Sequence, residues 1–409
     1  MRKLSLFALL FASNSFAQTA PELSSWVRNM AGKTGYGGIE SNVQRVQYSD
    51  SFVYVSCTCI PGYDIGPWPG NPNTPKNQNF LFKIARFPQA NTGTLTPTPL
   101  GHIGVWSNGV SIFNAKDARS YNNGGVWNQN AIVVEGSSFD ECLGHPAPNG
   151  EYHHHLNPVC LYNDKDSTHH SPIIGYAFDG YPIYGAYGYS VVTDSQIVSR
   201  MRSSYRLRNI SDRTTLANGT KLNASQSGPS ISSQYPLGYY IEDYEYVPGL
   251  GDLDSNNGRV CKTPEYPNGT YAYFVTIDEK GSAVYPYTFG PNYHGVVTPG
   301  NTGPQSGHIT IIESVLTYTG TNASTRSDET TGLSVYPNPT SYWLVVDYSS
   351  ASDYITSIEI TDSRGTTIYL ANAAGPTTYI PVTSLARGTY VVRVVTSSGT
   401  TCVRKLVKD

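Results

Sequence analysis

Histidine is the residue type whose distribution in this chain points most clearly to chemistry. Of nine histidines, six fall in one segment: His145, His153, His154, His155, His169 and His170. The run Tyr152-His-His-His155 follows the turn Asn149-Gly150, so we expect it to open a β-strand. Side chains alternate between the two faces of a strand. His153 and His155 then share one face, and His154 points the other way.

Two imidazoles on one face of a strand can bind one metal ion, with a third ligand supplied by another segment. His145, His169 and His170 are the nearest candidates for that ligand, and His294 and His308 are more distant ones. Imidazole ligands suit zinc and copper, which are the metals that we expect. The competing interpretation is that these histidines only form hydrogen bonds in a tyrosine-rich surface.

Two carboxylates just upstream of the cluster are weak candidates for catalysis. Asp140 and Glu141 could orient a metal ligand or act as a general base. Water activated by zinc would favour hydrolysis, and copper beside Tyr152 would favour redox chemistry. No glutamate follows His155 at the short distance typical of cupin metal sites, and no Gly-x-Ser-x-Gly motif supports a serine hydrolase. The reaction itself is not predicted.

The composition excludes several classes of protein. Charged residues make up 14% of the chain, against roughly 25% in a typical soluble domain. With 32 Tyr, 39 Gly and 27 Pro, the chain fits neither a helical bundle nor a charged disordered protein. A net charge of −3 provides no basic surface for nucleic acid. We therefore expect an all-β protein that has no nucleic-acid partner.

The N-terminal segment predicts export. Residues 1–17 combine a basic start, an apolar run and small residues before Gln18, as in a secretory signal peptide. We expect passage through the periplasm and a location that is secreted or at the cell surface. No later stretch has enough consecutive apolar residues for a transmembrane segment.

An oxidising location allows disulfides among the six cysteines. Cys142 and Cys160 are the best candidate pair. Cys57-x-Cys59 has no second close pair and does not form a four-cysteine zinc site. The pairing of Cys57, Cys59 and Cys261 stays open.

The body of the chain contains an internal duplication. The segment at 103–115 aligns without gaps with the segment at 174–186, and each carries an Asn-Gly or Asp-Gly hairpin signal between apolar runs. Pro148-Asn-Gly-Glu-Tyr152 recurs as Pro267-Asn-Gly-Thr-Tyr271. We infer two β-rich pseudo-repeats, at about 100–165 and 170–295. The second repeat has Tyr271-Ala-Tyr-Phe274 where the first has the histidines, so the scaffold does not require histidine there.

An insertion at 191–246 enlarges the second repeat. It carries five closely spaced arginines, which favour either an anion site or, with greater weight, a solvated face with local ion pairs. Residues 196–203 could form the one appreciable helix in an otherwise β-rich chain.

The sequence of the C-terminal part indicates a separate domain. Residues 317–332 are rich in Thr, Ser, Asn and Gly and predict a linker, whereas residues 333–409 alternate apolar and polar residues in short runs, which predicts a small β-sandwich. This tail resembles the type A C-terminal sorting domain of the type IX secretion system of Bacteroidota. The resemblance rests on Tyr336-Pro-Asn-Pro339, Ile360-Thr-Asp-Ser-Arg-Gly365, Leu385-Ala-Arg-Gly-Thr-Tyr390 and Lys405-Leu-Val-Lys-Asp409. It implies that the type IX machinery is a partner.

The body, at 18–316, resembles the YHYH-domain family over about 45–300. The segments that carry the resemblance include Ile65-Gly-Pro-Trp-Pro69, Val126-Trp-Asn-Gln-Asn130, Gly144-His-Pro-Ala-Pro148, Glu151-Tyr-His-His-His155 and Thr270-Tyr-Ala-Tyr-Phe274. The chain departs from the family signature at His154, where the signature has its second Tyr. The resemblance implies a secreted β-rich domain with a candidate metal site and no established reaction.

Three functions compete at this stage. The first is a secreted metal-binding protein, and one form of it is a metalloenzyme acting on an extracellular glycan or protein. The second is a carbohydrate-binding or adhesive module that uses aromatic faces at Trp68, Trp106 and Trp127, although buried core aromatics are commoner. The third is an inert surface component.

Overall fold

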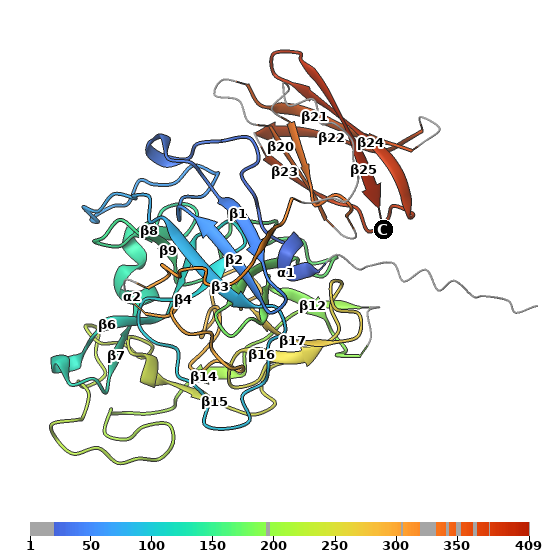
Figure 1. The fold of residues 1–409 in the computed structure, drawn as a ribbon. Coiled ribbons are helices and arrows are strands. Elements are labelled where there is room, and N and C mark those ends of the chain that lie inside the picture. Colours follow the sequence, from blue (N-terminus) through green and yellow to red (C-terminus); the bar gives the residue numbers. More distant parts are fainter. Residues whose placement is uncertain are drawn as a thin grey trace, which may run out of the picture.

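The computed structural model describes residues 20–193, 197–303, 306–319, 333–340, 343–348, 353–362, 366–375 and 377–408. The expected signal peptide at 1–17 lies outside them. In these residues the chain is built mainly from short strands, with a large body and a smaller C-terminal lobe (Figure 1). This is the all-β class that the composition predicts.

The first sheet of the body has four strands in the order β18-β1-β2-β3. They are β18 (Leu316–Thr317), β1 (Val43–Tyr48), β2 (Phe52–Cys57) and β3 (Phe80–Ala85). Alternate residues of β3 are buried, so one face of this sheet packs on the core while the other is partly solvated.

The second sheet has eight strands in the order β16-β17-β11-β10-β4-β5-β9-β8. Their bounds are β4 (His102–Trp106), β5 (Ser111–Phe113), β8 (Gly144–Pro146), β9 (Tyr152–His154), β10 (Ile173–Ala177), β11 (Pro182–Tyr184), β16 (Gly258–Cys261) and β17 (Thr270–Phe274). Nearly every residue of these strands is buried, and the central strands β4 and β10 are mostly apolar, as expected for strands that are covered on both faces.

The order of this sheet is that of a duplicated unit. The strand order is symmetric about its centre. Counted outward from the centre, β4, β5, β9 and β8 on one side correspond to β10, β11, β17 and β16 on the other. The antiparallel pair β4–β10 forms the centre. On each side a hairpin strand pairs in parallel with the next element, β5 with β9 and β11 with β17. The strands from about 100–165 lie on one side of the β4–β10 contact and those from about 170–295 lie on the other, so the strand order is compatible with the expected pseudo-repeats, whose bounds stay a prediction.

Equivalent turns join the central hairpins. Gly109 has φ +83° and Gly180 has φ +90°, conformations that favour glycine. Asn108 Oδ1 accepts the N–H of Val110, and Asp179 Oδ1 accepts the N–H of Tyr181. The Asn-Gly and Asp-Gly signals therefore produce the same local structure twice.

Short two-stranded sheets lie outside the central sheet. They pair β6 (Lys116–Ser120) with β7 (Asn128–Asn130), β12 (Tyr187–Tyr189) with β13 (Val198–Arg200), and β14 (Tyr205–Leu207) with β15 (Tyr244–Tyr246). The helix expected at 196–203 is wrong in its described part, because β13 pairs there with β12 and Arg200 lies opposite Tyr187. The backbone N–H and C=O groups of β13 bond to the tyrosine-rich strand β12 instead of to one another within a helix.

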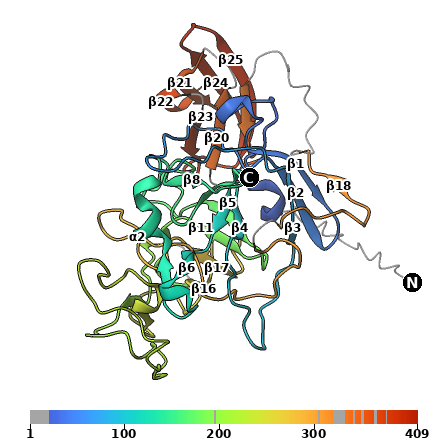
Figure 2. The ribbon, with the colours of Figure 1, turned by 90° about the vertical axis from the view of Figure 1, so that its left-hand side faces the viewer.

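Helices in the described residues are short. Two are α-helical, α1 (Pro21–Ser24) and α2 (Ala131–Glu135), and four are 3₁₀ turns: η1 (Tyr36–Gly38), η2 (Tyr121–Asn123), η3 (Gly136–Ser138) and η4 (Ile241–Asp243). Asn130 caps α2, because its side chain accepts the N–H of Ile132. Figure 2 shows α2 at the periphery of the body. No helix of the described residues is long and apolar enough to cross a membrane.

The C-terminal lobe has its own buried cluster and two facing sheets. One has the order β19-β20-β23 and the other β22-β21-β24-β25. Their strands are β19 (Leu333–Tyr336), β20 (Trp343–Tyr348), β21 (Ile355–Thr361), β22 (Thr367–Gly375), β23 (Thr377–Pro381), β24 (Gly388–Thr396) and β25 (Thr401–Lys408).

The linker expected at 317–332 begins later than its first residue. Thr317 still pairs with Gln47 of β1, and Tyr318 donates its N–H to the carbonyl of Val46. Residues 320–332 lie outside the described residues, so the boundary there stays a prediction.

A disulfide joins Cys142 and Cys160 across the segment that contains β8 and β9. The remaining cysteines, Cys57, Cys59, Cys261 and Cys402, are buried thiols. The bridge closes the loop that carries the histidine strand.

We predict that replacing Cys142 and Cys160 together by alanine lowers the free energy of unfolding of the body by about 3 kcal/mol, because the unfolded chain regains the entropy of that loop. Urea unfolding followed by tryptophan fluorescence measures the change. Cys402→Ala, in the other lobe, is the control and should leave the body transition in place. Equal midpoints for the double variant and the wild type would contradict the prediction.

Candidate metal centre

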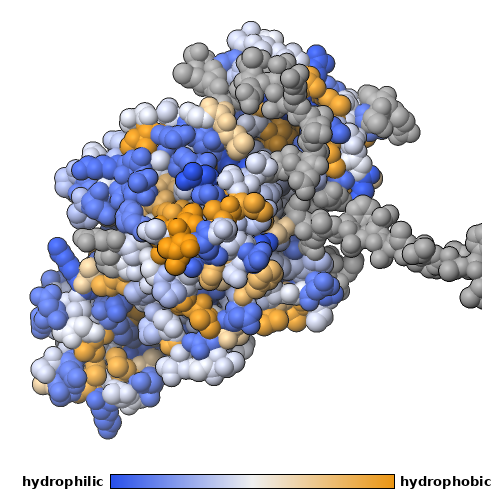
Figure 3. All heavy atoms as spheres, in the orientation of Figure 1, coloured by the Kyte–Doolittle hydropathy of each residue, from blue (hydrophilic) through white to orange (hydrophobic). Residues whose placement is uncertain are grey.

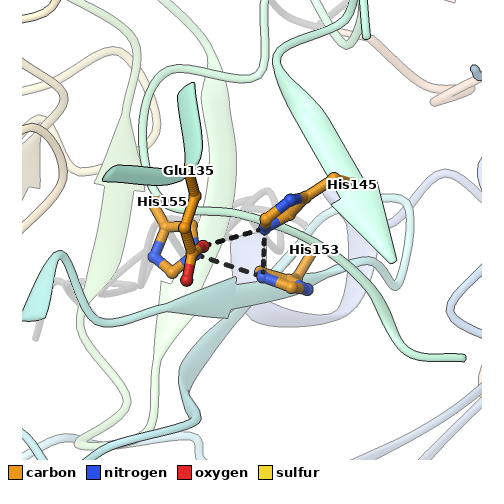
Figure 4. A group of neighbouring side chains, drawn as sticks. All are labelled: Glu135, His145, His153 and His155. Atoms are coloured by element: carbon orange, nitrogen blue, oxygen red, sulfur yellow. Dashed lines mark hydrogen bonds and ion pairs between the residues drawn. The ribbon is translucent and has the colours of Figure 1, made fainter. Parts of the chain in front are cut away.

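The two strands at the end of the central sheet place the candidate ligands. β8 and β9 are antiparallel, and their register sets His145 directly opposite His153. His155 follows β9 and lies on the same side as His153, as alternation along a strand requires. Glu135, the last residue of α2, approaches the same point from outside the sheet (Figure 4).

The four ligand atoms form a tight group. Nε2 of His153 lies 3.0 Å from Nε2 of His145 and 3.1 Å from Nε2 of His155. Oε2 of Glu135 lies 3.1 Å from His145 Nε2 and 3.2 Å from His155 Nε2. All four atoms are within 4.8 Å of one another. Ligands about 2.0 to 2.1 Å from one tetrahedral zinc would be separated by about 3.3 Å, close to these distances.

The hydrogen bond at Nδ1 determines which nitrogen of each ring carries the proton. Nδ1 of His153 lies 3.0 Å from the carbonyl oxygen of Glu151, and Nδ1 of His155 lies 2.7 Å from that of Asn114. A carbonyl only accepts, so both Nδ1 atoms must be N–H donors. The neutral rings then present Nε2 without hydrogen.

His145 is oriented in the same way through a hydroxyl. Ser138 Oγ donates to the carbonyl of Glu135 at 2.8 Å, so its oxygen accepts from His145 Nδ1, also at 2.8 Å. All three imidazoles therefore turn their N–H outward and their lone pair inward. Such hydrogen bonds to the far nitrogen are typical of metal-binding histidines.

Aromatic rings enclose the site on the protein side. Phe113 stacks on His153 with ring centres 3.8 Å apart, and Phe139 meets His145 edge-on at 4.8 Å. The three histidines are 3% to 6% exposed, whereas the Glu135 side chain is 29% exposed. The group is thus buried in apolar surroundings and open to solvent at the glutamate.

The electrostatics favour neutral imidazoles and an ionised glutamate. Burial, followed by the neighbouring rings, lowers the pKa of His153 well below its ordinary value, and burial also lowers the pKa of His145. Burial opposes ionisation of Glu135, and its contacts with His145 and His155 lower its pKa when those rings carry a hydrogen or a positive charge toward it. Burial and the nearby Glu135 raise the pKa of Asp117, whose side chain bonds to that glutamate.

The other histidines predicted as ligands lie elsewhere. His169 is 37% exposed at its side chain and pairs with Asp166, with 2.9 Å between Nδ1 and Oδ2. His170 is buried, and its Nδ1 donates to the carbonyl of Ser171. His294 stacks on Tyr271, and His308 lies beside Phe80. The structure therefore brings together His145, His153 and His155 from the set named by the sequence.

The carboxylate candidates from the sequence do not reach the group. Asp140 accepts hydrogen bonds from Tyr152 Oη, Trp68 Nε1 and three backbone N–H groups, so it anchors the far side of β9. Glu141 is exposed.

Sequence reasoning missed Glu135. The expected carboxylates, Asp140 and Glu141, lie just before His145, whereas Glu135 lies further upstream at the end of a short helix. Its position directly after the apolar run at 131–134 was the available signal.

The second half shows what the same scaffold holds without these ligands. In β16–β17, Arg259 lies opposite Ala272, in the register that His145 and His153 occupy in β8–β9. Phe274 takes the place of His155. The Arg259 guanidinium lies 5.7 Å from the centre of the Phe274 ring. The ligand set is therefore a property of the first half alone.

The aromatic residues considered for glycan binding are mostly core residues. Trp106 and Trp127 are 0% and 1% exposed, and Trp68 is half-buried against Tyr36 and Tyr152. Hydrophilic and hydrophobic residues are mixed on the face in Figure 3. Trp106 and Trp127 do not form an exposed stacking surface.

The arginines of the insertion are committed to internal pairs. Arg213 and Asp243 form a fully buried ion pair at 2.7 Å, while Arg202 pairs with Asp252 and Arg206 with Glu245. Local ion pairing, rather than an anion site, accounts for these three residues.

Comparison with known families divides the chain as the folds do. Residues 81–284 match a family model described as YHYH protein, and residues 334–409 match one described as a secretion system C-terminal sorting domain. No curated protein matches the chain.

Two solved structures show weak likeness. A DUF3244 family protein with an immunoglobulin-like β-sandwich fold, from Bacteroides vulgatus, is 17% identical over 21% of this chain and 93% of that chain, with a TM-score of 0.18. PorZ, a surface component of the type IX secretion system of Porphyromonas gingivalis, is 13% identical over 93% of this chain and 46% of its own, with a TM-score of 0.17. At these scores neither likeness bears on function.

We predict that His170 makes stability depend on pH. Burial, with Arg259 nearby, lowers the pKa of His170 to about 4, whereas an unfolded chain binds the proton near 6.5. Between these values only the unfolded state is protonated, so stability is lost as the pH falls from 6.5 toward 4.

His170→Phe should remove about 2 kcal/mol of the stability difference between pH 7 and pH 4.5, measured by urea unfolding at both values. His169→Phe, at the surface, is the matched control. An unchanged difference in the His170 variant would contradict the assignment.

Proposed function

We propose that this chain, which carries a YHYH protein domain at 81–284 followed by a type IX C-terminal sorting domain at 334–409, binds one transition metal ion through His145, His153, His155 and Glu135. The sorting domain indicates that the protein is secreted or attached to the cell surface after passing through the periplasm, and that it interacts with the type IX machinery. The metal centre would then face an extracellular substrate.

One observation carries the proposal. Three Nε2 lone pairs and one carboxylate oxygen converge, and none of the four side chains offers a hydrogen to the others, since each imidazole N–H bonds outward. Four acceptors at such distances repel one another unless a cation lies between them. Burial in an apolar setting strengthens that repulsion.

The ligand chemistry favours zinc or copper. Neutral imidazoles suit both ions, and one carboxylate offsets part of the charge in a buried site. When bound, zinc would supply an acidified water and copper would supply one-electron chemistry. Among the ligands, Glu135 is the most exposed and comes from a five-residue helix. It is therefore the ligand best placed to exchange for water or substrate, and Asp117 lies against it to hold a proton.

The proposed activity is that of a metalloenzyme acting on an extracellular glycan or protein. This rests on the combination of an exchangeable ligand, a solvent-open side and an exported chain. The alternative is a carbohydrate-binding or adhesive module without catalysis. It has less support, because Trp106 and Trp127, two of its three candidate aromatic residues, are buried in the core.

We predict that protein purified without added metal contains about one zinc or copper ion per chain, by elemental analysis. His153→Ala combined with His155→Ala should abolish binding, because two of three nitrogen ligands are lost. His169→Ala combined with His170→Ala is the matched control and should keep the ion. Wild-type protein that neither contains nor takes up metal on titration would refute the proposal.

We predict that Glu135→Gln lowers metal affinity by about tenfold, because the amide keeps the size of the side chain and removes the charge at the ligand oxygen. Competition with a chelator measures the affinity. Glu141→Gln, a nearby exposed residue, serves as the control. Equal affinities for Glu135→Gln and wild type would show that Glu135 is not a ligand.

A further inference from the structure

A second buried polar network lies behind the metal centre. His102, in β4, is 0% exposed, and its Nδ1 lies 2.9 Å from Oε1 of Glu151. The same Oε1 accepts from Ser111 Oγ at 2.5 Å. On the other side of the ring, His102 Nε2 lies 2.7 Å from Ser306 Oγ. Four residues from four separate segments thus form one chain of hydrogen bonds.

Ser306, His102 and Glu151 have the spacing of a hydrolytic triad, but the hydrogen bond between serine and histidine has the opposite direction to the one that catalysis needs. Ser306 Oγ also lies 2.7 Å from the carbonyl of Gly303, which can only accept. The hydroxyl hydrogen therefore points at Gly303, and Ser306 accepts from His102 Nε2. A nucleophilic serine must instead give its hydrogen to histidine.

The network connects to the metal centre through one residue. Glu151 is clamped at its carboxylate by His102 and Ser111, and its backbone carbonyl accepts the Nδ1 hydrogen of His153. Phe113 connects the two as well, since it stacks on His153 and lies 6.3 Å edge-on from His102. The position of Glu151 therefore sets the orientation and the tautomer of the central ligand.

The second half of the sheet shows that the fold does not need this network. His102 pairs with Phe113 as Ile173 pairs with Tyr184, and Ser111 corresponds to Pro182. Thr270 stands where Glu151 stands, one residue before the equivalent tyrosine. An apolar residue thus replaces the buried histidine in the half that lacks the ligands.

Burying an imidazole and a carboxylate removes both from water, which is costly even when they are paired. An isoleucine at the same register position avoids that cost. The network and the ligand set occur together in one half and are both missing from the other.

From this co-occurrence and the Glu151 contact, we propose that His102 and Glu151 are positioning residues that tune metal affinity by holding His153, an inference that rests on the proposed function. His102 orients the Glu151 carboxylate, and the Glu151 carbonyl then fixes Nδ1–H of His153. Interactions behind a metal ligand of this kind change metal affinity by about 10- to 100-fold.

The test replaces each residue by its counterpart from the second half of the full chain. His102→Ile and Glu151→Thr, singly and together, remove the network, and Glu151→Gln removes the charge with little change of shape. His154→Tyr is the matched control, because it also exchanges a buried histidine for its counterpart, Tyr273. Zinc affinity is measured by chelator competition, and Co²⁺ absorption reports the ligand geometry.

We expect the network variants to bind zinc about 10- to 100-fold more weakly and to shift the Co²⁺ spectrum, with circular dichroism unchanged. His154→Tyr should match the wild type in both. If His102→Ile or Glu151→Thr fails to fold, Glu151→Gln decides the question.

Folded network variants with wild-type affinity and spectrum would overturn the positioning role while leaving the metal centre intact. A wild-type protein that binds none of zinc, Co²⁺ and copper would overturn the metal centre itself, and the positioning role with it.

Discussion

The antiparallel pairing of β4 with β10 is the constraint on which the body depends. It brings two copies of one unit edge to edge, so that their hairpins and parallel strands continue a single sheet to both sides. Because this sheet is buried on both faces, its inner strands carry few polar groups. The candidate metal ligands lie on the outer strands β8 and β9, while His102 on β4 and Ser111 on β5 form the buried network beside them.

The two halves solve the same packing problem with different residues. Two equivalent tyrosines, Tyr152 in β9 and Tyr271 in β17, each donate to an aspartate, Tyr152 to Asp140 and Tyr271 to Asp254. These pairs are part of the shared scaffold. The halves differ at equivalent backbone positions. His145 of the first half corresponds to Arg259 of the second, and His155 corresponds to Phe274. The two halves therefore share one strand order although their side chains differ.

Much of the fold could be read from the sequence, because its signals are local. Asn-Gly and Asp-Gly between apolar runs specify the hairpins, and the spacing of the repeated segments showed the duplication. Alternation along a strand correctly put His153 and His155 on one face. The expected helix at 196–203 failed because pairing with β12, a contact made in space, outweighs local preference.

The sequence by itself determined the export signal at the tail, the β class, the duplication and two of the histidines that meet. Each of these depends on neighbouring residues along the chain or on a motif that can be recognised in the sequence alone. Only the tertiary structure selected His145 over His169 and His170, added Glu135, and turned Asp140 away. Those choices depend on strand register and on where a short helix ends, and both are fixed by packing between distant segments.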